Sequence, residues 1–251
     1  MPRILVTNDD GVHSEGIHAL ADALRRLGAV TIVAPTGESS AIGHALTLAR
    51  PLRLETIGEE VFAVDGTPTD CVNIAVTKVL ASPPDLVVSG INKGYNLGDD
   101  ITYSGTVAGA LEGTLLGIPS IAVSLERSST PDFAVAAATT AGIAEDVLAF
   151  GLPPRTLLNI NVPRRPTRGW RVTVQAKRNH VTSVVEAVDP RSRAYFWIEE
   201  GQNDWEPHDL SDYQAVRDGW ISLTPLHPDM THHAALPAVE TLCRRAQAGV
   251  R

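Results

Sequence analysis

Cysteine is scarce in this 251-residue sequence, which excludes a fold held together by a disulfide framework. The two cysteines, Cys71 and Cys243, lie far apart in the chain and form no CxxC pair. The sequence also begins directly with an apolar run, without the charged leader and cleavage site of a secretion signal. We therefore expect both thiols to be reduced and the protein to be cytoplasmic.

Basic clusters and long apolar runs are absent as well. The formal net charge is −8, and the 21 lysines and arginines form no block that could follow a nucleic-acid backbone. No uninterrupted apolar run approaches the roughly 18 residues that a membrane span requires. We expect neither polymeric nucleic acid nor a membrane among the partners of this protein.

Several common catalytic and phosphate-binding motifs are also missing. The sequence has no GxGxxG after its first predicted strand, no GxxxxGK[ST] and no HExxH. The segment GESSAIG, residues 37–43, approaches a nucleophile elbow, but Ala41 stands where the elbow requires its second glycine. The sequence therefore supports neither a dinucleotide site nor a Walker-type phosphate site.

Apolar runs and helical patterns alternate along the first two thirds of the chain. Continuous apolar runs are typical of strands buried on both faces of a sheet, and apolar residues three or four positions apart are typical of helices that cover it. This alternation predicts an α/β fold with a doubly wound, mostly parallel sheet. The predicted strands cover 3–7, 29–35, 52–56, 61–64, 85–92, 118–125 and 156–163; one predicted helix begins at Thr67-Pro68, and others cover 16–28, 104–117 and 131–151.

The character of the sequence changes after Pro163. The following region is irregular and β-like, it contains Trp197, Trp205 and Trp220, and a final helix is predicted to begin at Pro237. We expect residues 1–163 to form the α/β core, and residues 164–251 to form a β-hairpin and oligomerisation region with a C-terminal helix. The hairpin is expected to reach toward a partner subunit.

Two adjacent aspartates, Asp9 and Asp10, follow the first predicted strand. Neighbouring carboxylates repel each other unless a cation or a proton relieves them. Further oxygen donors, in Ser39-Ser40 and in residues 89–92, follow other predicted strands whose ends meet at the same edge of a parallel sheet. This set favours a hard divalent cation such as Mg²⁺, Mn²⁺ or Ca²⁺. The alternative is a turn aspartate beside a helix cap.

A glycine-rich loop and a predicted helix start form a second constellation. Glycines at positions 90, 94 and 98 allow the backbone to approach a ligand closely. Ser104, Gly105 and Thr106 are predicted to stand at a helix N-terminus, where free N–H groups attract an anion. Together with the aspartates, this arrangement suggests a phosphate held between a metal ion and a helix start. An ordinary loop followed by a serine cap is the alternative.

Five segments of the sequence resemble the SurE family of stationary-phase survival proteins. They are ILVTNDDG, VAPTGESSAIGHALT, GTPTDCVNIA, SGINKGYNLGDDITYSGTVAGALEG and SLTPLHPDMT, and they occur in order over nearly the whole chain. The resemblance implies a Rossmann-like three-layer α/β sandwich whose C-terminal β-hairpin region is exchanged between the subunits of a homodimer or homotetramer. It also implies a divalent-metal-dependent phosphatase that hydrolyses nucleoside 5′- and 3′-monophosphates to nucleoside and phosphate.

Transferred onto this sequence, the resemblance assigns a role to each matching residue. Asp9 and Asp10 would be the catalytic carboxylates. One divalent ion per subunit, Mg²⁺ or Mn²⁺, would be bound by Asp9, Asp10, Ser40 and Asn92, and the phosphate by Asn96, Ser104, Gly105 and Thr106.

The loop of residues 36–50, called the serine loop because it contains Ser39 and Ser40, departs from the common family pattern at two positions. Ala41 replaces a glycine, and His44 stands where asparagine is frequent. The choice of Ser40 over Ser39 therefore rests on counting back from Leu46-Thr47. His44 is a candidate for contact with the leaving group, which it could assist by protonation.

Two functions without phosphate turnover remain as alternatives. One is a signalling module that accepts a phosphoryl group on an aspartate after its first strand. Such a module would be shorter and would need a lysine after a late strand, a position that none of Lys78, Lys93 and Lys177 occupies. The other is a nucleotide-binding protein that uses the same site without catalysis, which only an assay can distinguish.

Overall fold

A nine-stranded sheet forms the centre of the computed structural model, which describes residues 1–179, 182–200 and 204–249. The strand order is β3-β4-β2-β1-β5-β6-β7-β13-β8. The strands from β4 to β7 in this order run parallel: β1 (Arg3–Thr7), β2 (Ala29–Pro35), β4 (Val61–Val64), β5 (Leu86–Lys93), β6 (Ser120–Leu125) and β7 (Leu157–Val162). The predicted mostly parallel sheet is confirmed.

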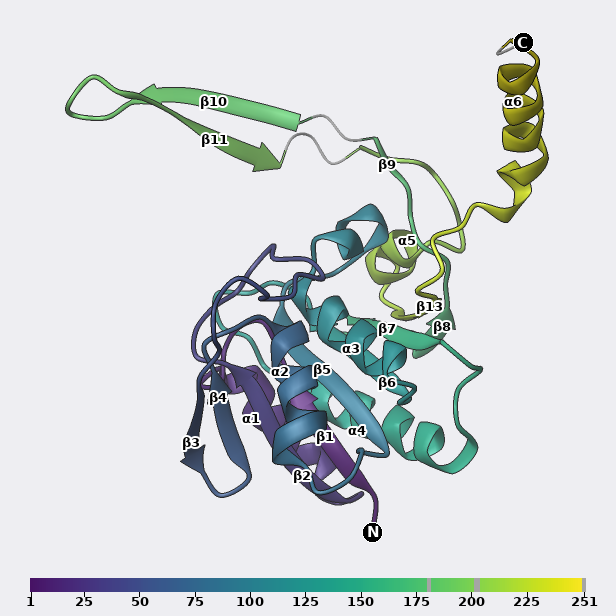
Figure 1. The fold of residues 1–251 in the computed structure, drawn as a ribbon. Helices are drawn as coiled ribbons and strands as arrows, with labels where there is room; N and C mark the ends of the chain where they lie inside the picture. Colours follow the sequence, from purple (N-terminus) through teal and green to yellow (C-terminus); the bar gives the residue numbers. More distant parts are fainter. Residues whose placement is uncertain (180–181, 201–203, 250–251) are drawn as a thin grey trace.

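Helices cover both faces of this sheet and make three layers (Figure 1). On one face α1 (Glu15–Leu24) packs against α4 (Ala134–Phe150), and on the other α2 (Pro68–Ile74) packs against α3 (Gly105–Leu115). The two central strands β1 and β5 are continuously apolar over residues 4–6 and 86–88, as is typical of strands buried on both faces. In β1, Ile4 and Val6 belong to the core on the α1 and α4 side, and Leu5 belongs to the core on the α2 side.

The helix predicted over 16–28 ends earlier in the structure, at Leu24. Gly28 does not cap the helix. It lies where the chain turns into β2, and an added Cβ there would come within 2.2 Å of the Pro2 carbonyl oxygen. The next residue, Ala29, donates its N–H to the same carbonyl at 2.8 Å. Gly28 is therefore needed for close approach to Pro2, and the prediction of a longer helix was wrong.

The start of α2 matches the sequence prediction. Thr67 caps the helix by accepting a hydrogen bond from the N–H of Asp70 at 3.1 Å, and the Asp70 carboxylate accepts one from the N–H of Thr67 at 2.9 Å. This reciprocal pair is a capping box, and Pro68 occupies the first helical position, where its missing N–H costs nothing. The helix continues into a π-helical turn, Ala75–Val79.

The chain after Pro163 both extends the sheet and leaves it. β8 (Trp170–Val172) and β13 (Ile221–Leu226) join the sheet beyond β7, and β3 (Leu54–Gly58) forms the opposite edge. Strands from both sides of residue 163 thus belong to one sheet, and the predicted division there stays a prediction. The remaining elements are η2 (Gly98–Thr102), β9 (Arg178–Asn179), β10 (Thr182–Val188), β11 (Ala194–Glu200), β12 (Asp204–Trp205), α5 (Asp212–Arg217), η3 (His233–Ala235) and α6 (Leu236–Gly249).

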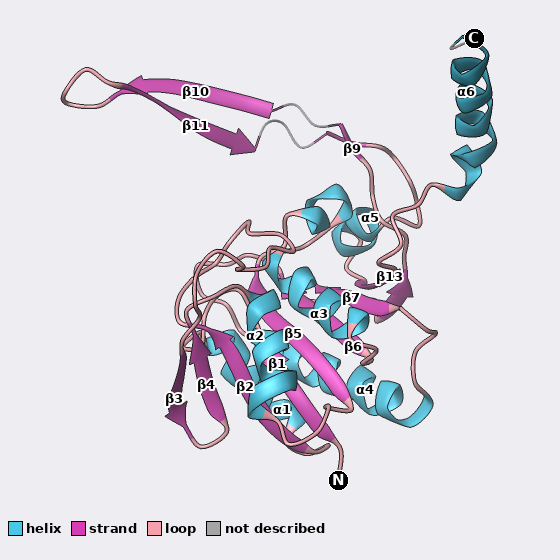
Figure 2. Cartoon of the chain, in the orientation of Figure 1, coloured by secondary structure: helices cyan, strands magenta, loops and turns pink. Residues whose placement is uncertain are grey.

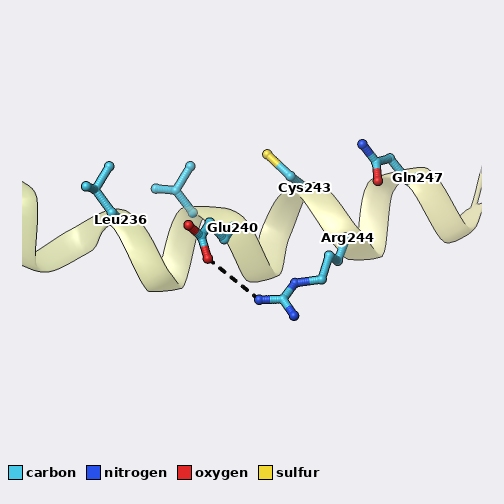
Figure 3. A pocket seen from close by; sticks show the side chains of 6 residues that line it. Leu236, Glu240, Cys243, Arg244 and Gln247 are labelled. Atoms are coloured by element: carbon cyan, nitrogen blue, oxygen red, sulfur yellow. Dashed lines mark ion pairs between the residues drawn. The ribbon is translucent and has the colours of Figure 1, made fainter.

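The β10-β11 hairpin and α6 project away from the body of the molecule (Figures 1 and 2). The predicted C-terminal hairpin region is therefore present. Figure 3 shows Leu236 and Cys243 along α6, where Glu240 and Arg244 form an ion pair at 3.7 Å. Both cysteines of the chain are free, Cys71 in the core and Cys243 on the surface of α6. In the described ranges, no helix has the length and apolarity needed to cross a membrane.

Candidate active site

The candidate site lies at the carboxyl ends of β1 and β5, at the centre of the sheet. β1 has β2 on one side and β5 on the other, so the strand order reverses direction at this point. Ligands of open α/β sheets bind in the crevice that such a reversal leaves. Asp9 and Asp10 follow β1, and Asn92 lies near the end of β5, whose Ser89 pairs with Thr7 of β1. The topology therefore brings the predicted strand ends together.

The N-terminus of α3 is pressed directly against Asp9. A Cβ atom added to Gly105 would lie 2.8 Å from the Cβ of Asp9 and 2.9 Å from its Oδ2, so only glycine permits this approach. The hydroxyl of Thr106 donates a hydrogen bond to Asp9 Oδ1. One turn further, a Cβ at Gly109 would come within 2.9 Å of Ser89 Oγ. Small residues thus place the positive end of the helix dipole beside a buried carboxyl group.

Both aspartates are held in an environment that disfavours their charge. Burial raises the pKa of Asp9 to about 6; the bond from Thr106 lowers it, and the neighbouring charge of Asp10 raises it again. Burial likewise raises the pKa of Asp10, with a further increase from the carboxylate of Glu38. A cation between the two carboxylates would relieve both the burial cost and the mutual repulsion.

The donor set at this site fits a hard divalent cation. Asp10 Oδ2 is buried and has no hydrogen-bond partner among the described residues, which is costly for a carboxylate oxygen. Over the described part of the chain, no group of three or more His, Cys, Asp or Glu side chains could hold a metal. A cation here would therefore rely on two carboxylates and on neutral oxygen donors, as the chemistry of Mg²⁺ and Mn²⁺ allows.

Of the predicted serine and asparagine ligands, Ser40 lies in the loop after β2 and Asn92 lies near the end of β5. Ser39 donates its N–H to the carbonyl oxygen of Asp9 at 2.8 Å, which ties the loop to the end of β1. Ser40 is exposed, and its hydroxyl donates to Glu38 Oε1 at 2.7 Å. Asn92 donates its amide to the carbonyl oxygen of Gly94 at 2.9 Å, so its Oδ1 is the atom left for a cation. The ligand roles of Ser40 and Asn92 stay predictions.

The predicted phosphate-binding residues already have structural roles. Ser104 caps α3 by accepting a hydrogen bond from the N–H of Val107 at 3.0 Å. Asn96 is buried; its side-chain amide donates to Ser124 Oγ at 2.8 Å, and its N–H donates to Asn161 Oδ1 at 2.9 Å. These bonds hold the glycine-rich loop against β6 and β7. Contact of Asn96 with a phosphate stays a prediction.

Two cationic residues near Asp10 were missed by the sequence reasoning. The charges of Lys93 and Arg127 lower the pKa of Asp10, opposing the effect of its burial. A Cβ at Gly94 would lie 3.6 Å from Arg127 Nε, so the guanidinium group stands next to the turn after β5. The available signal was position: Lys93 is the last residue of β5, and Arg127 follows the end of the adjacent strand β6.

The sequence profile of the family described as "Survival protein SurE" matches residues 4–182. The chain belongs to the SurE family. The protein named 5′-nucleotidase SurE from Geobacter metallireducens is 53% identical over 243 residues, which cover 95% of this chain and 96% of that protein. The 5′-nucleotidase SurE of Syntrophotalea carbinolica is 54% identical over 231 residues, which cover 91% of this chain and 92% of that protein.

Solved structures agree with this SurE assignment. The crystal structure of the SurE protein from Aquifex aeolicus superposes on this chain with a TM-score of 0.86 at 43% sequence identity. The superposition covers 96% of this chain and 99% of that chain, so it includes the C-terminal region as well as the sheet. The predicted family and the Rossmann-like fold that it implies are confirmed.

His44 of the serine loop is held against α3 by its side chain and by the residue that precedes it. Its Nε2 lies 2.7 Å from Glu112 Oε2, and the side chain is 32% exposed, whereas that of Glu112 is 9% exposed. The preceding residue, Gly43, donates its N–H to the carbonyl oxygen of Tyr103 at 2.9 Å, immediately before the cap of α3. The ring is thus fixed by protein contacts and still accessible to a ligand. Its predicted contact with the leaving group stays a prediction.

Proposed function

We propose that this protein is a phosphomonoesterase that hydrolyses nucleoside 5′-monophosphates to nucleoside and phosphate. The observation that carries the proposal is the contact between the N-terminus of α3 and Asp9, beside the unpartnered oxygen of Asp10. That arrangement combines an anion-binding helix end with a cation-binding carboxylate pair, which together suit a phosphate ester. Relatives that share about half of their residues with this chain and are named 5′-nucleotidase SurE support it.

The metal-binding residues that we propose are Asp9, Asp10, Ser40 and Asn92, which would hold one Mg²⁺ or Mn²⁺ ion per subunit. A divalent cation, when bound, supplies Lewis-acid activation of the phosphoryl group and of a water molecule. The raised pKa values of both aspartates and the unpartnered Asp10 Oδ2 support this set. The nearby cations Lys93 and Arg127 add positive charge that favours an anionic substrate.

The residues of the chain bind the phosphate and move the protons of the reaction. The free N–H groups at the start of α3, at Gly105 and Thr106, with the hydroxyl of Ser104 and the amide of Asn96, hold the phosphate oxygens and stabilise their charge as the ester bond breaks. One of the two aspartates accepts the proton that the attacking water loses. The departing nucleoside oxygen takes up a proton and leaves as an alcohol.

The proposal is tested by phosphate release from a panel of nucleoside 5′- and 3′-monophosphates. Each substrate is assayed in chelator, with Mg²⁺ and with Mn²⁺, for the wild type and for Asp9→Asn. Metal-dependent release from the 5′-monophosphates that is lost in Asp9→Asn supports the function and the site. Tight nucleotide binding without release from any substrate would overturn the proposed catalysis and favour a binding protein. Release from the 3′-monophosphates would extend the substrate range as the family resemblance implies.

We also propose that a second copy of the chain covers the projecting C-terminal elements, in a homodimer or homotetramer. Phe196, Trp197 and Ile198 on the hairpin and Leu242 on α6 are more than 60% exposed, which is unusual for large apolar side chains of a monomer. Light scattering on the full chain tests the assembly, and a monomer at micromolar concentration would contradict it. The free thiols of Cys71 and Cys243 support a reducing, cytoplasmic location.

A further inference from the structure

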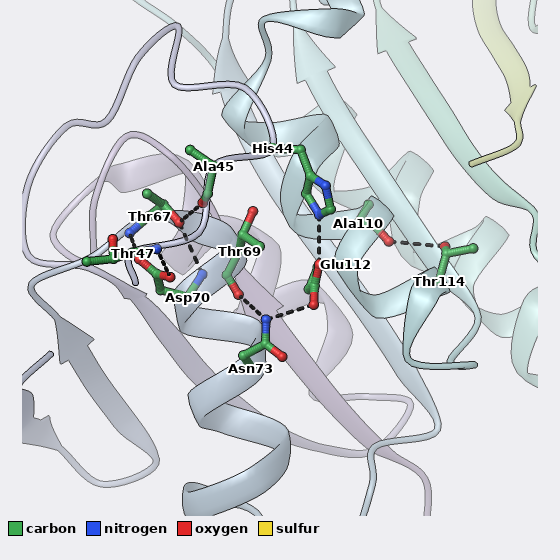
Figure 4. Close-up of polar contacts among 10 residues, drawn as sticks. All are labelled: His44, Ala45, Thr47, Thr67, Thr69, Asp70, Asn73, Ala110, Glu112 and Thr114. Carbon is green, nitrogen blue, oxygen red and sulfur yellow. Dashed lines mark hydrogen bonds and ion pairs between the residues drawn. The ribbon is translucent and has the colours of Figure 1, made fainter. Parts of the chain in front are cut away.

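Three polar side chains from separate parts of the sequence form a connected cluster beside the proposed active site. His44 comes from the serine loop, Asn73 from α2 and Glu112 from α3 (Figure 4). Glu112 Oε2 lies 2.7 Å from His44 Nε2, and Glu112 Oε1 accepts a hydrogen bond from Asn73 Nδ2 at 2.7 Å. Asn73 also donates to the carbonyl oxygen of Thr69 at 3.1 Å, which fixes the direction of its amide.

The cluster lies on the same stripe of α3 as the contact with Asp9. Gly105, which touches Asp9, and Glu112 are two helical turns apart and so face the same way. His44 bridges the distance between them, because Gly43 bonds to Tyr103 at the start of the helix while the ring reaches along it to Glu112. The loop backbone therefore meets the chain just before α3, and the imidazole lies along the helix on the face that carries both Gly105 and Glu112.

The serine loop is fastened on the far side of His44 as well. The hydroxyl of Thr67 donates to the carbonyl oxygen of Ala45 at 2.7 Å, and the N–H of Thr47 donates to Asp70 Oδ1 at 2.9 Å. Both contacts use the capped N-terminus of α2 (Figure 4). Helix α2 therefore holds the backbone of the loop, and α2 and α3 together hold the His44 side chain.

The charge of Glu112 decides which nitrogen of His44 carries a proton. Burial raises the pKa of Glu112, but the hydrogen bonds from His44 and Asn73 outweigh it and leave the pKa below its ordinary value, despite the nearby charge of Asp70. An ionised carboxylate only accepts hydrogen bonds, so Nε2 of His44 must carry the proton that it donates. The other nitrogen, Nδ1, has no protein partner among the described residues.

We propose that Glu112, oriented by Asn73, is a positioning residue that fixes His44 with Nε2–H toward the carboxylate and Nδ1 toward the leaving group of the substrate. The inference rests on the proposed phosphatase function. When water attacks phosphorus, the ester P–O bond breaks and its electron pair goes to the nucleoside oxygen. That oxygen takes the proton from Nδ1–H of the imidazolium, and neutral His44 later regains a proton from solvent. Glu112 stays ionised throughout and keeps the hydrogen bond from Nε2–H of His44.

The first test compares two leaving groups in Glu112→Gln. The side-chain NH₂ group of a glutamine at position 112 can face either Asn73 or His44. Facing Asn73 Nδ2, it would place two hydrogen-bond donors against each other. Facing His44 Nε2, it would donate to that nitrogen, which then cannot carry a proton. We expect kcat for nucleoside 5′-monophosphates to fall about 10- to 100-fold, because these alcohols leave poorly without an acid. We expect less than about a 3-fold loss with p-nitrophenyl phosphate, whose phenolate leaves without protonation. Equal losses on both substrates would overturn the proposal.

Coupling to His44 is tested by a double-mutant cycle. If Glu112 acts through the imidazole, Glu112→Gln has no further effect on kcat in a His44→Ala background. The same fold-loss in both backgrounds would contradict this. Asn73→Ala keeps the Glu112 carboxylate and should show a smaller loss of kcat that is again selective for nucleotides. This variant replaces Glu112→Gln in the test if Glu112→Gln folds poorly. Thr114→Val is the matched control: its hydroxyl bonds to the Ala110 carbonyl on the same helix, away from His44, and the ratio of the two substrates should not change.

A measurement independent of turnover separates this inference from the proposed function. Nitrogen NMR of the His44 ring in the full chain should show the proton on Nε2 in the wild type at a pH where the ring is neutral. A shift of the proton toward Nδ1, or a mixture of tautomers, is expected in Glu112→Gln. If no phosphate ester is hydrolysed, the proposed function fails, and the NMR result still shows whether Glu112 sets the tautomer. A wild-type ring protonated on Nδ1 would overturn the positioning role.

Discussion

Two buried carboxyl groups lie along α3, Asp9 against Gly105 at its start and Glu112 two helical turns further on, and their pKa values move in opposite directions. Burial raises the pKa of Asp9 to about 6, whereas the pKa of Glu112 is lowered although burial acts to raise it. The two groups differ in how deeply they are buried and in their partners. Each oxygen of the Glu112 carboxylate accepts one hydrogen bond, from His44 and from Asn73. Asp9 accepts a side-chain hydrogen bond on one oxygen only, from Thr106, and has the like charge of Asp10 beside it.

The comparison shows how one helix serves two kinds of site. At Glu112 the protein itself supplies a hydrogen-bond partner for each carboxylate oxygen. The carboxylate therefore needs no ligand and holds the His44 ring in a fixed position. At Asp9 the glycine-rich face of α3 brings a helix end close, but Lys93 and Arg127 compensate the charge of the carboxylate pair only in part, because both pKa values remain raised. Carboxyl groups whose pKa values stay raised in the folded chain are typical of sites that a ligand completes. The following variants test this contrast, starting with the largest expected effect.

Asp9→Asn is expected to abolish phosphate release and, in chelator, to stabilise the fold. We expect kcat/KM to fall at least about 10²-fold, because the substitution removes a charged group that touches the reacting centre. At about pH 8 the free energy of unfolding without metal should rise by about 1 to 3 kcal/mol, because an ionised carboxylate with a raised pKa destabilises the folded state. Thermal unfolding with chelator measures this, and the exposed Asp146→Asn on α4 is the control. A lower stability of Asp9→Asn than of the wild type in chelator would contradict the claim that the Asp9 charge destabilises the folded state.

Gly105→Ala tests the close approach of α3 to Asp9. The new Cβ would lie 2.8 Å from the Asp9 Cβ, so the helix or the carboxylate must shift. We expect a loss of about 1 to 3 kcal/mol in stability, typical of overpacking, and a loss of about 10-fold or more in kcat/KM. Gly142→Ala in α4 is the matched control, because its Cβ meets nothing within 4 Å. That variant should be stabilised by about 0.5 to 1 kcal/mol.

The part of the site around Asp9 could be predicted from sequence to a large extent. Strands β1 and β2 have the predicted bounds, and a polar pair after a buried strand in an α/β chain indicates a strand-end site whatever the family. The helix start at Gly105 also follows from local signals, because Ser104 is a typical cap. Such signals are local in sequence, which is why residue patterns and the SurE resemblance could locate them.

The cluster of His44, Asn73 and Glu112 could not be predicted in the same way. Its three members are separated by 29 and 39 positions in the sequence, so only the packing of α2 against α3 brings them together. Nothing in the helix pattern distinguishes Glu112 from a solvent-facing glutamate until its burial is known. Arg127 was missed for a related reason, since its proximity to Asp10 depends on the pairing of β6 with β5. Gly28 was misread as a helix cap because its tertiary contact with Pro2 overrides the local signal.

The support supplied by Glu112 should depend on pH in the direction opposite to that of Asp9. A carboxyl group whose pKa is lowered below 4.5 on folding stabilises the protein above that pH and loses the contribution as the pH falls through the folded-state value. At about pH 7, Glu112→Gln should lower the free energy of unfolding by about 1 to 2 kcal/mol, because it disturbs two buried hydrogen bonds. Urea unfolding of both proteins should show this difference shrinking below pH 4.5. Glu59→Gln, at an exposed glutamate in the turn between β3 and β4, is the control for the loss of a carboxylate.

Thr67→Ala should have the smallest effect and bears on how the Glu112 cluster is held. The substitution removes the side-chain cap of α2 and the bond to the Ala45 carbonyl, and it should cost about 1 kcal/mol in chemical unfolding. Because Asp70 still binds Thr47 and Asn73 still binds Glu112, the His44 ring should keep its Nε2 proton and kcat should change little. Ser211→Ala at the cap of α5 is the matched control for a lost cap. If Thr67→Ala instead matched Glu112→Gln in selective loss of nucleotide turnover, the loop anchor would position His44, and Glu112 would merely accompany it.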